Sequence, residues 1–496
     1  MKLQDFPEDL QPYLLPQPAG RMVYRCLECG AEYGIEQLLY TCPHCQGLFL
    51  LVDLEAQRLK ERPGSFWRRL FDHRRLLNDP AVRGVFCFHE LIAPIIPRED
   101  IVYLGECHTP VVQANPRLQE EVGLTFYFKN DGQNPSASFK DRGMAAALSY
   151  LNYTIRTQNL SGVLAICAST GDTSAAAALY AAYLGDKVAS AVLLPHGKVT
   201  PQQLSQPLGA GARVLEIPGV FDDCMRVVEA LAEHYHVALL NSKNSWRIRG
   251  QESYAYELAQ WFDYDLAGKV IVVPIGNAGN ITAVLEGLLR FHDLGVIEAL
   301  PQVIGVQSRH ANPVFRYYQE RNPAKRLFVP VTVQPSVAQA AMIGRPVSMP
   351  RVIRLVEEYS QQAGDGSFAV VEVTEQEIMD NMLLANRNGH IACTQGGESL
   401  AGLRAARRAG LLGRDDVAVV DATAHHLKFI GFQQMYFDNT FPPEFAVTPR
   451  PEYQNRPQLL QPAITPSHSP WTPEELQAFT RDMVAQVAAA LGLQKK

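Results

Sequence analysis

The stretch that decides the fold is KVIVVPIGNAGN at residues 269–280, where a short β-branched run ends in a Gly-Asn turn. A helical stretch from Ile281 to Leu294 follows it directly. The same alternation recurs from about Ile101 onward: Gly162 to Cys167 then Thr173 to Leu184, Lys187 to Leu194 then Pro201 to Leu208, and the run Gln302 to Val306. Strands that alternate with helices form parallel sheets with crossover helices. The sequence therefore predicts an open α/β architecture that binds ligands at the carboxyl ends of its strands.

Composition and charge exclude several other classes of protein. The 496 residues, 55.0 kDa, are enough for two or three folding units, and 47% hydrophobic with 19% charged residues is not a disordered composition. A formal charge of −6 provides no bulk positive field for nucleic acid. The longest apolar stretches fall far short of the roughly 20 residues that span a bilayer, and the N-terminus does not resemble a signal peptide. We therefore expect no nucleic-acid or membrane partner and a cytoplasmic location.

Four of the nine cysteines form a metal-binding pattern. Cys26, Cys29, Cys42 and Cys45 have the spacing C-x2-C-x12-C-x2-C. Redox-active dithiols or unrelated thiols are the alternatives, but two such pairs within 20 residues favour a zinc ribbon with four thiolate ligands. Because all four positions are filled, the site is expected to be structural rather than catalytic.

Two loops carry most of the functional information. The turn at residues 276–280 lets backbone N–H groups converge at a helix N-terminus, which suits a phosphate. The alternative is that the Gly-Asn turn only connects a strand to a helix and binds no ligand. It matches neither the lysine-containing P-loop nor the dinucleotide fingerprint. The second loop, NPSASFKDRG at residues 134–143, places Lys140 near the head of an Ala-rich helix expected from Met144. Lys140 is either a nucleophilic amine with a lowered pKa or an ordinary solvated lysine.

Read together, these loops resemble known motifs. Residues 134–143 are similar to the cofactor-lysine motif of pyridoxal-phosphate enzymes of the tryptophan synthase β-like fold, called fold type II. Residues 168–175, ASTGDTSA, look like their substrate loop, and residues 276–280 like their phosphate loop. Within that superfamily SFKDRG, NSKNSWR at residues 241–247 and TAHHLK at residues 423–428 are most similar to the threonine synthases. The resemblance runs from about Tyr103 to Phe429.

The resemblance implies a role for each matching residue. Lys140 would form the Schiff base with pyridoxal 5′-phosphate and move protons, with Phe139 against the pyridine ring. The cofactor phosphate would lie on Gly276, Asn277, Ala278, Gly279 and Asn280, and Thr423 would bond the pyridine nitrogen. Ser169, Thr173, Asn241 and Arg247 would bind a phosphorylated amino acid.

Asp172 would face the cofactor's 3′ oxygen, where many family members have Asn. A carboxylate beside a phenolate-like oxygen is repulsive unless the two share a proton.

Composition and motif spacing, together with the resemblance, predict an organisation of the chain. Residues 1–53 would contain the N-terminal segment and zinc ribbon, residues 54–100 a helical linker, and residues 101–445 the pyridoxal-phosphate-dependent catalytic domain. A smaller subdomain at about 144–245 would be inserted in that domain. Residues 446–496 would form a Pro-rich strap and a final helix, Pro473 to about Leu491, capped by Thr472. That helix would pack onto the body or a partner subunit, and the resemblance implies a homodimer.

The activity implied is a lyase reaction of threonine biosynthesis. O-phosphohomoserine and water would give L-threonine and phosphate, by elimination at the γ carbon and addition of water at the β carbon. One alternative is a cysteate synthase-like β-replacement on O-phosphoserine with sulfite. Another is a non-catalytic relative whose ribbon binds a macromolecule, which the charge of −6 and the presence of Lys140 disfavour.

Overall fold

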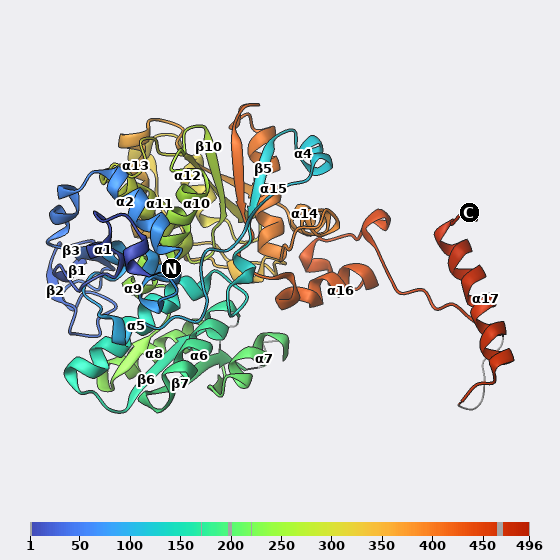
Figure 1. Ribbon diagram of the computed structural model, residues 1–496, viewed down its shortest axis with the longest axis horizontal. Coiled ribbons are helices and arrows are strands. Elements are labelled where there is room, and N and C mark those ends of the chain that lie inside the picture. Colours follow the sequence, from blue (N-terminus) through green and yellow to red (C-terminus); the bar gives the residue numbers. More distant parts are fainter. Residues whose placement is uncertain (1, 170, 197–200, 220, 464–469, 496) are drawn as a thin grey trace.

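The chain forms three β-sheets, two of them surrounded by helices (Figure 1). The computed structural model describes residues 2–495 except 170, 197–200, 220 and 464–469. The predicted α/β fold class, with two parallel-sheet regions and a small cysteine-bearing sheet before them, is confirmed.

The large sheet has the strand order β12-β11-β10-β13-β5-β4. Its strands are β4 Val111–Gln113, β5 Thr125–Lys129, β10 Lys269–Pro274, β11 Gln302–Ser308, β12 Phe368–Val373 and β13 Val417–Asp421. All neighbours are parallel except the edge strand β4, which runs antiparallel to β5. Residues 270–274 of β10 are all buried, as expected for a strand covered by helices on both faces.

The small sheet has the order β8-β7-β6-β9 and is wholly parallel. It consists of β6 Val163–Ala168, β7 Val188–Pro195, β8 Arg213–Ile217 and β9 Val237–Leu239. Helices α6 Asp172–Leu184, α7 Pro201–Gly209 and α8 Phe221–His234 connect these strands (Figure 1). The runs predicted at residues 162–167 and 187–194 are therefore strands, each displaced by one residue.

Helices of the large sheet and of the region between the sheets complete the core. They are α4 Pro116–Val122, α5 Lys140–Gln158, α9 Ser245–Gln251, α10 Ser253–Trp261, α11 Gly279–Asp293, α12 Pro313–Gln319, α13 Met349–Ala363, α14 Glu375–Arg387, α15 Thr394–Arg408 and α16 Ile430–Asp438. Helix α5 begins at Lys140, four residues before the expected start at Met144. Lys140 is thus the first residue of the helix. Among the described residues, no helix combines the length and the apolar character that a membrane span requires.

The N-terminal sheet, β1 Met22–Cys26, β2 Glu32–Gly34 and β3 Phe49–Asp53, is antiparallel and packs on α9. The Phe49 carbonyl accepts hydrogen bonds from Ser245 Oγ at 3.0 Å and from Arg351 Nη2 at 2.7 Å. The Leu51 carbonyl accepts from the buried guanidinium of Arg249. Helices α1 Gln11–Leu14, α2 Gly64–Arg74 and α3 His89–Ile92 lie in the flanking segments.

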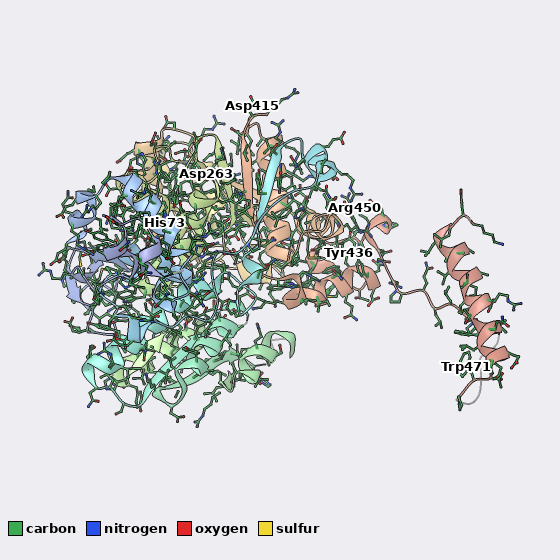
Figure 2. The ribbon with its side chains drawn as sticks, viewed as in Figure 1. His73, Asp263, Asp415, Tyr436, Arg450 and Trp471 are labelled. Carbon is green, nitrogen blue, oxygen red and sulfur yellow. The ribbon has the colours of Figure 1, made fainter. Side chains whose placement is uncertain are left out.

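The chain leaves the body after α16 and ends in a helix that stands apart, α17 Pro473–Leu491 (Figure 1). Tyr436 and Arg450 lie together where the chain departs, and Trp471 lies on the separate part (Figure 2). Thr472 caps α17 as predicted, accepting a hydrogen bond from the Glu475 amide at 3.2 Å. None of the 19 residues of α17 is buried, so its expected packing onto the body is not observed.

Candidate active site

A short pairing between two distant loops fixes the position of Lys140. The Phe139 amide donates to the Thr423 carbonyl at 2.9 Å, and the His425 amide donates to the Ala137 carbonyl at 3.0 Å. Ala137 has a φ of +63°, a conformation that glycine adopts more easily. The pairing places the first residue of α5 beside the loop that follows β13, at the carboxyl edge of the large sheet.

The amine of Lys140 lies against an aromatic ring and has a lowered pKa. Its Nζ lies 3.9 Å from the centroid of the Phe139 ring. Burial, reinforced by the positive charge of Arg247, lowers the pKa of Lys140 to about 7, against the attraction of Asp172 and Asp421. A large fraction of the amine is therefore unprotonated near neutral pH, as Schiff-base chemistry requires.

Two glycines bring Arg247 close to the lysine. A Cβ on Gly143 of α5 would lie 2.8 Å from the Arg247 carbonyl oxygen, and one on Gly250 of α9 would lie 2.2 Å from the Arg142 carbonyl oxygen. Any larger residue would force α5 and α9 apart.

Arg247 is buried, and no acidic side chain among the described residues pairs with it. Its side chain is 2% exposed and donates from Nη1 to the Leu240 carbonyl at 2.9 Å, while Nε has no hydrogen-bond partner among the described residues. Burial lowers the pKa of this guanidinium to about 10. Burying a charged guanidinium costs free energy unless an anion lies beside it. The surroundings of Arg247 therefore suit a bound phosphate or carboxylate.

Residues 276–278 lie in the turn between β10 and the 15-residue helix α11, and Gly279 and Asn280 are the first two residues of that helix, which begins two residues before the predicted start at Ile281. Ala278 has a φ of +62°, and a Cβ on Gly276 would approach Ala341 Cα to 3.0 Å. Asn277 Oδ1 accepts from the Val347 amide at 3.4 Å, which anchors the loop. The N–H groups of the first turn of α11 have no partners within the helix and are available to an anion.

Asn280 connects this loop to the end of β13. Its Nδ2 donates to Asp421 Oδ2 at 2.8 Å. Burial and the charge of Asp131 raise the pKa of Asp421 well above its usual value. The turn at residues 276–280 and the loop bearing Thr423 are therefore fixed to each other.

The predicted substrate loop lies between β6 and α6. Asp172 is buried at the first position of α6, and Ser169 and Thr173 beside it are half-buried. Asn241 uses both ends of its amide on Ala168, donating to the carbonyl at 2.7 Å and accepting from the N–H at 3.2 Å. In this arrangement the Asn241 side chain positions the loop.

Several buried polar atoms around Lys140 have no hydrogen-bond partner in the described chain: Ser138 Oγ, Arg247 Nε, Asn280 Oδ1 and Asp421 Oδ1. Unpaired buried polar groups are rare in proteins and call for a ligand or ordered water. Together with the free N–H groups of α11, they fit a polar cofactor that carries a phosphate. Thr423 lies in the loop after β13, and its Oγ1 is 3.8 Å from Cys393 Sγ.

A buried charge network lies behind the lysine. Arg142 donates to Asp131 Oδ1 at 2.7 Å and to Glu257 Oε1 at 2.6 Å, and Lys129 Nζ pairs with Glu257. Although burial opposes it, the two cations hold the pKa of Glu257 well below its usual value. The network fixes the start of α5, two residues from Lys140.

The four cysteines converge as the spacing predicts. All four Sγ atoms lie within 4.8 Å of one another, with Cys26 and Cys45 at 3.4 Å and Cys29 and Cys42 at 3.7 Å. Thiolates on a tetrahedral zinc with 2.3 Å bonds would be about 3.8 Å apart. The cluster fits a zinc ion with no open position.

One zinc per chain is expected in protein purified without chelator, as measured by elemental analysis. Cys42→Ser should lose the metal and lower the melting temperature, because a structural zinc contributes directly to folding. Cys224→Ser, at a buried cysteine outside the cluster, is the control that should retain it. Metal-free wild type with Cys26 and Cys45 freely alkylated would contradict the expectation.

Sequence reasoning missed Asp421, Lys428 as a site residue, and the network around Arg142. Asp421 could have been noticed as an acid that directly follows an apolar run.

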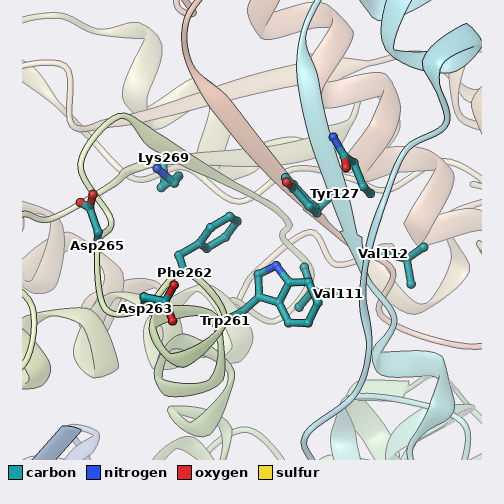
Figure 3. Close-up of a pocket in the computed structure, with 9 residues that line it drawn as sticks. Val111, Val112, Tyr127, Trp261, Phe262, Asp263, Asp265 and Lys269 are labelled. Carbon is teal, nitrogen blue, oxygen red and sulfur yellow. The ribbon is translucent and has the colours of Figure 1, made fainter.

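A separate cavity of about 620 Å³ lies between the edge strand β4 and the end of α10, lined by Val111, Tyr127, Trp261 and Phe262 among others (Figure 3). None of the predicted site residues lines it.

The fold and the site define a class of protein. A protein-family model described as "Pyridoxal-phosphate dependent enzyme" matches residues 102–422. The chain belongs to this family, and the expected cofactor class is confirmed.

The relatives identify the branch of that family. The chain is 35% identical over 410 residues to a threonine synthase of Methanocaldococcus jannaschii, covering 82% of this chain and 93% of that protein. It is 35% identical to threonine synthase 2, chloroplastic, of Arabidopsis thaliana, over 80% of this chain and 75% of that protein. The chain is therefore a member of the threonine synthase family.

Solved structures share the fold. Threonine synthase from Escherichia coli superposes with a TM-score of 0.62 at 20% identity, covering 86% of this chain and 94% of that one. Maize serine racemase gives a TM-score of 0.53 at 17% identity, covering 72% and 98%.

Proposed function

We propose that this protein converts O-phosphohomoserine and water into L-threonine and phosphate. The observation that carries the proposal is Arg247, a buried guanidinium that has no acidic partner in the described part of the chain and that acts electrostatically on Lys140. A site with an amine nucleophile and a separate unpaired guanidinium suits an amino acid that carries its own phosphate. The names of the relatives support the same activity.

In this proposal the side chains hold the cofactor from several sides. Pyridoxal 5′-phosphate would be held through Lys140, with its ring against Phe139, its phosphate on residues 276–280 and its pyridine nitrogen facing Thr423. Once bound, it withdraws electrons from the α carbon of an amino acid. Asp172 would face its 3′ oxygen.

The remaining residues orient the substrate and move protons. Arg247 would bind the substrate phosphate bidentately, assisted by the hydroxyls of Ser169 and Thr173, with Asn241 holding their loop. Lys140 Nζ would take the α proton and transfer protons at later steps, because its lowered pKa lets it act as a base near neutral pH. The departing phosphate, still held by Arg247, is kept away from bulk water.

The domain division at residues 53, 100 and 445, with a subdomain at about 144–245, belongs to the same proposal. So do a structural zinc in residues 1–53, a homodimer and a cytoplasmic location. Part of the proposed strap, residues 464–469, lies outside the described residues.

The test is phosphate release by the cofactor-loaded protein from O-phosphohomoserine, compared with O-phosphoserine plus sulfite. We expect phosphate and threonine in equal amounts from the first substrate and no phosphate from the second. Release only from O-phosphoserine with sulfite would replace the proposal with β-replacement. Release from neither would contradict both.

Arg247→Lys should raise KM for O-phosphohomoserine about 10- to 100-fold. A lysine offers a point charge in place of bidentate hydrogen bonds to the phosphate, whose loss reduces the binding free energy by roughly 1.5 to 3 kcal/mol. Steady-state phosphate release measures this effect. Arg213→Lys, on the exposed surface of β8, is the matched control and should leave KM unchanged. An unaltered KM in Arg247→Lys would remove the phosphate-binding role.

A further inference from the structure

Lys428 forms an ion pair in the site that the roles assigned so far do not use. Its Nζ lies 3.0 Å from Asp172 Oδ1, with side chains 14% and 3% exposed. Lys428 belongs to the short helix η10 His426–Phe429, which follows β13 of the large sheet, whereas Asp172 begins α6 of the small sheet. The pair therefore joins the two sheet regions at the site.

A second contact ties Lys428 to the loop that bears the nucleophile. Its Nζ also donates to the Ser136 carbonyl at 2.9 Å. Gln206 Nε2, from α7 of the small-sheet region, donates to the same carbonyl at 3.2 Å. Ser136 lies four residues before Lys140, so the two subdomains and the lysine loop meet at one carbonyl.

The surroundings require a cation at this place. Asp172 and Lys428 both act on Lys140 and Asp141 of α5, and Asp172 also acts on Cys393 at the start of α15. Asp141 is itself a buried acid, whose pKa burial raises to about 7. Two neighbouring buried acids without a counter-ion would repel each other and any anionic oxygen placed nearby.

We propose that Lys428 is a positioning residue that neutralises Asp172 and aims it at the cofactor's 3′ oxygen, so that a carboxylate can occupy this position. The inference rests on the proposed function only in taking Asp172 to face that oxygen. Lys428 thereby offsets the negative charge of Asp172 next to the amine of Lys140, and it links the two sheet regions at the site. It acts through Asp172 and is not itself a catalytic group.

The first readout is the pH midpoint of the visible absorption band of the cofactor-loaded protein, which needs no substrate. Lys428→Met removes a positive charge, so protonation becomes easier and the midpoint should rise by about one pH unit or more. Asp172→Asn removes the negative charge and should lower it. Lys428→Arg, which keeps the cation, should remain within a few tenths of a unit of wild type.

The second readout is the melting temperature of the cofactor-free protein. Lys428→Met should lower it by about 2 °C or more in the wild-type background, because a buried carboxylate loses its partner. In the Asp172→Asn background, Lys428→Met should lower the melting temperature by less than half as much. Lys60→Met, which breaks an exposed 2.6 Å pair with Asp293, is the matched control and should alter neither readout.

An unchanged midpoint in Lys428→Met, or equal melting losses in the two backgrounds, would overturn the inference. If Lys428→Met does not fold, the pH midpoints of Lys428→Arg and Asp172→Asn decide the question. A midpoint that does not fall in Asp172→Asn would also overturn the inference. Failure of wild type to release phosphate would sink the proposed function, whereas these two readouts remain independent of substrate.

Discussion

Lys140→Ala is expected to abolish phosphate release from O-phosphohomoserine, with a loss of about 1,000-fold or more in kcat. The substitution removes both the amine that captures the cofactor and the group proposed to move protons. The loaded variant should also lack the visible band that borohydride bleaches in wild type. Absorption spectra and coupled phosphate assays measure the two effects.

The rate at which cofactor-free wild type captures pyridoxal 5′-phosphate should rise with pH up to about 7 and then level off. The sign follows from the lowered pKa of Lys140, because the reactive form is the unprotonated amine, which predominates above that pKa. Lys60→Ala, at an exposed lysine, is the control and should behave as wild type. A yellow, active Lys140→Ala protein would refute the assignment of the nucleophile.

Arg142→Met should have the largest effect on stability, destabilising the fold by about 3 to 5 kcal/mol. Arg142 is fully buried and satisfies both Asp131 and Glu257, at 2.7 and 2.6 Å. Its removal leaves two buried carboxylates with Lys129 as the remaining cation of this network. Thermal and urea unfolding of the cofactor-free protein measure the loss.

Arg25→Met is the control for a surface pair. Arg25 pairs with Glu32 at 2.7 Å, and the two side chains are 39% and 41% exposed, so the expected cost is about 1 kcal/mol or less. Equal losses in the two variants would show that the buried network contributes no more than a surface pair.

Local sequence pattern predicted much of the fold. The β10–α11 unit was identifiable because a buried parallel strand is continuously apolar and its turn contains Gly276 and Gly279. The lysine loop and the four cysteines were likewise visible, because each motif lies within about 20 residues. The start of α5 was placed too late because Asp141, Arg142 and Gly143 do not read as helix interior. They are helical here because tertiary contacts hold them.

The electrostatics of the site could not be predicted in the same way. Arg142 meets Glu257 across 115 residues, and the Lys428–Asp172 pair joins two different sheets. Such contacts depend on strand order, which no local pattern encodes. Arg247 was predicted as an anion-binding residue from resemblance, but its burial and the absence of an acidic partner among the described residues emerged only from the packing of α9 on α5.

Two carbonyls of β3, those of Phe49 and Leu51, connect the N-terminal sheet to the body. They are the acceptors for Arg351 and Arg249, and Arg249 is two residues from Arg247 on one short helix. Removing residues 1–53 would take one hydrogen-bond acceptor from each of these two buried guanidinium groups and would remove the sheet that packs on α9, the helix that contains Arg247. The cysteine-bearing sheet is thus part of the packing that supports the candidate active site, and we do not expect it to be dispensable for folding.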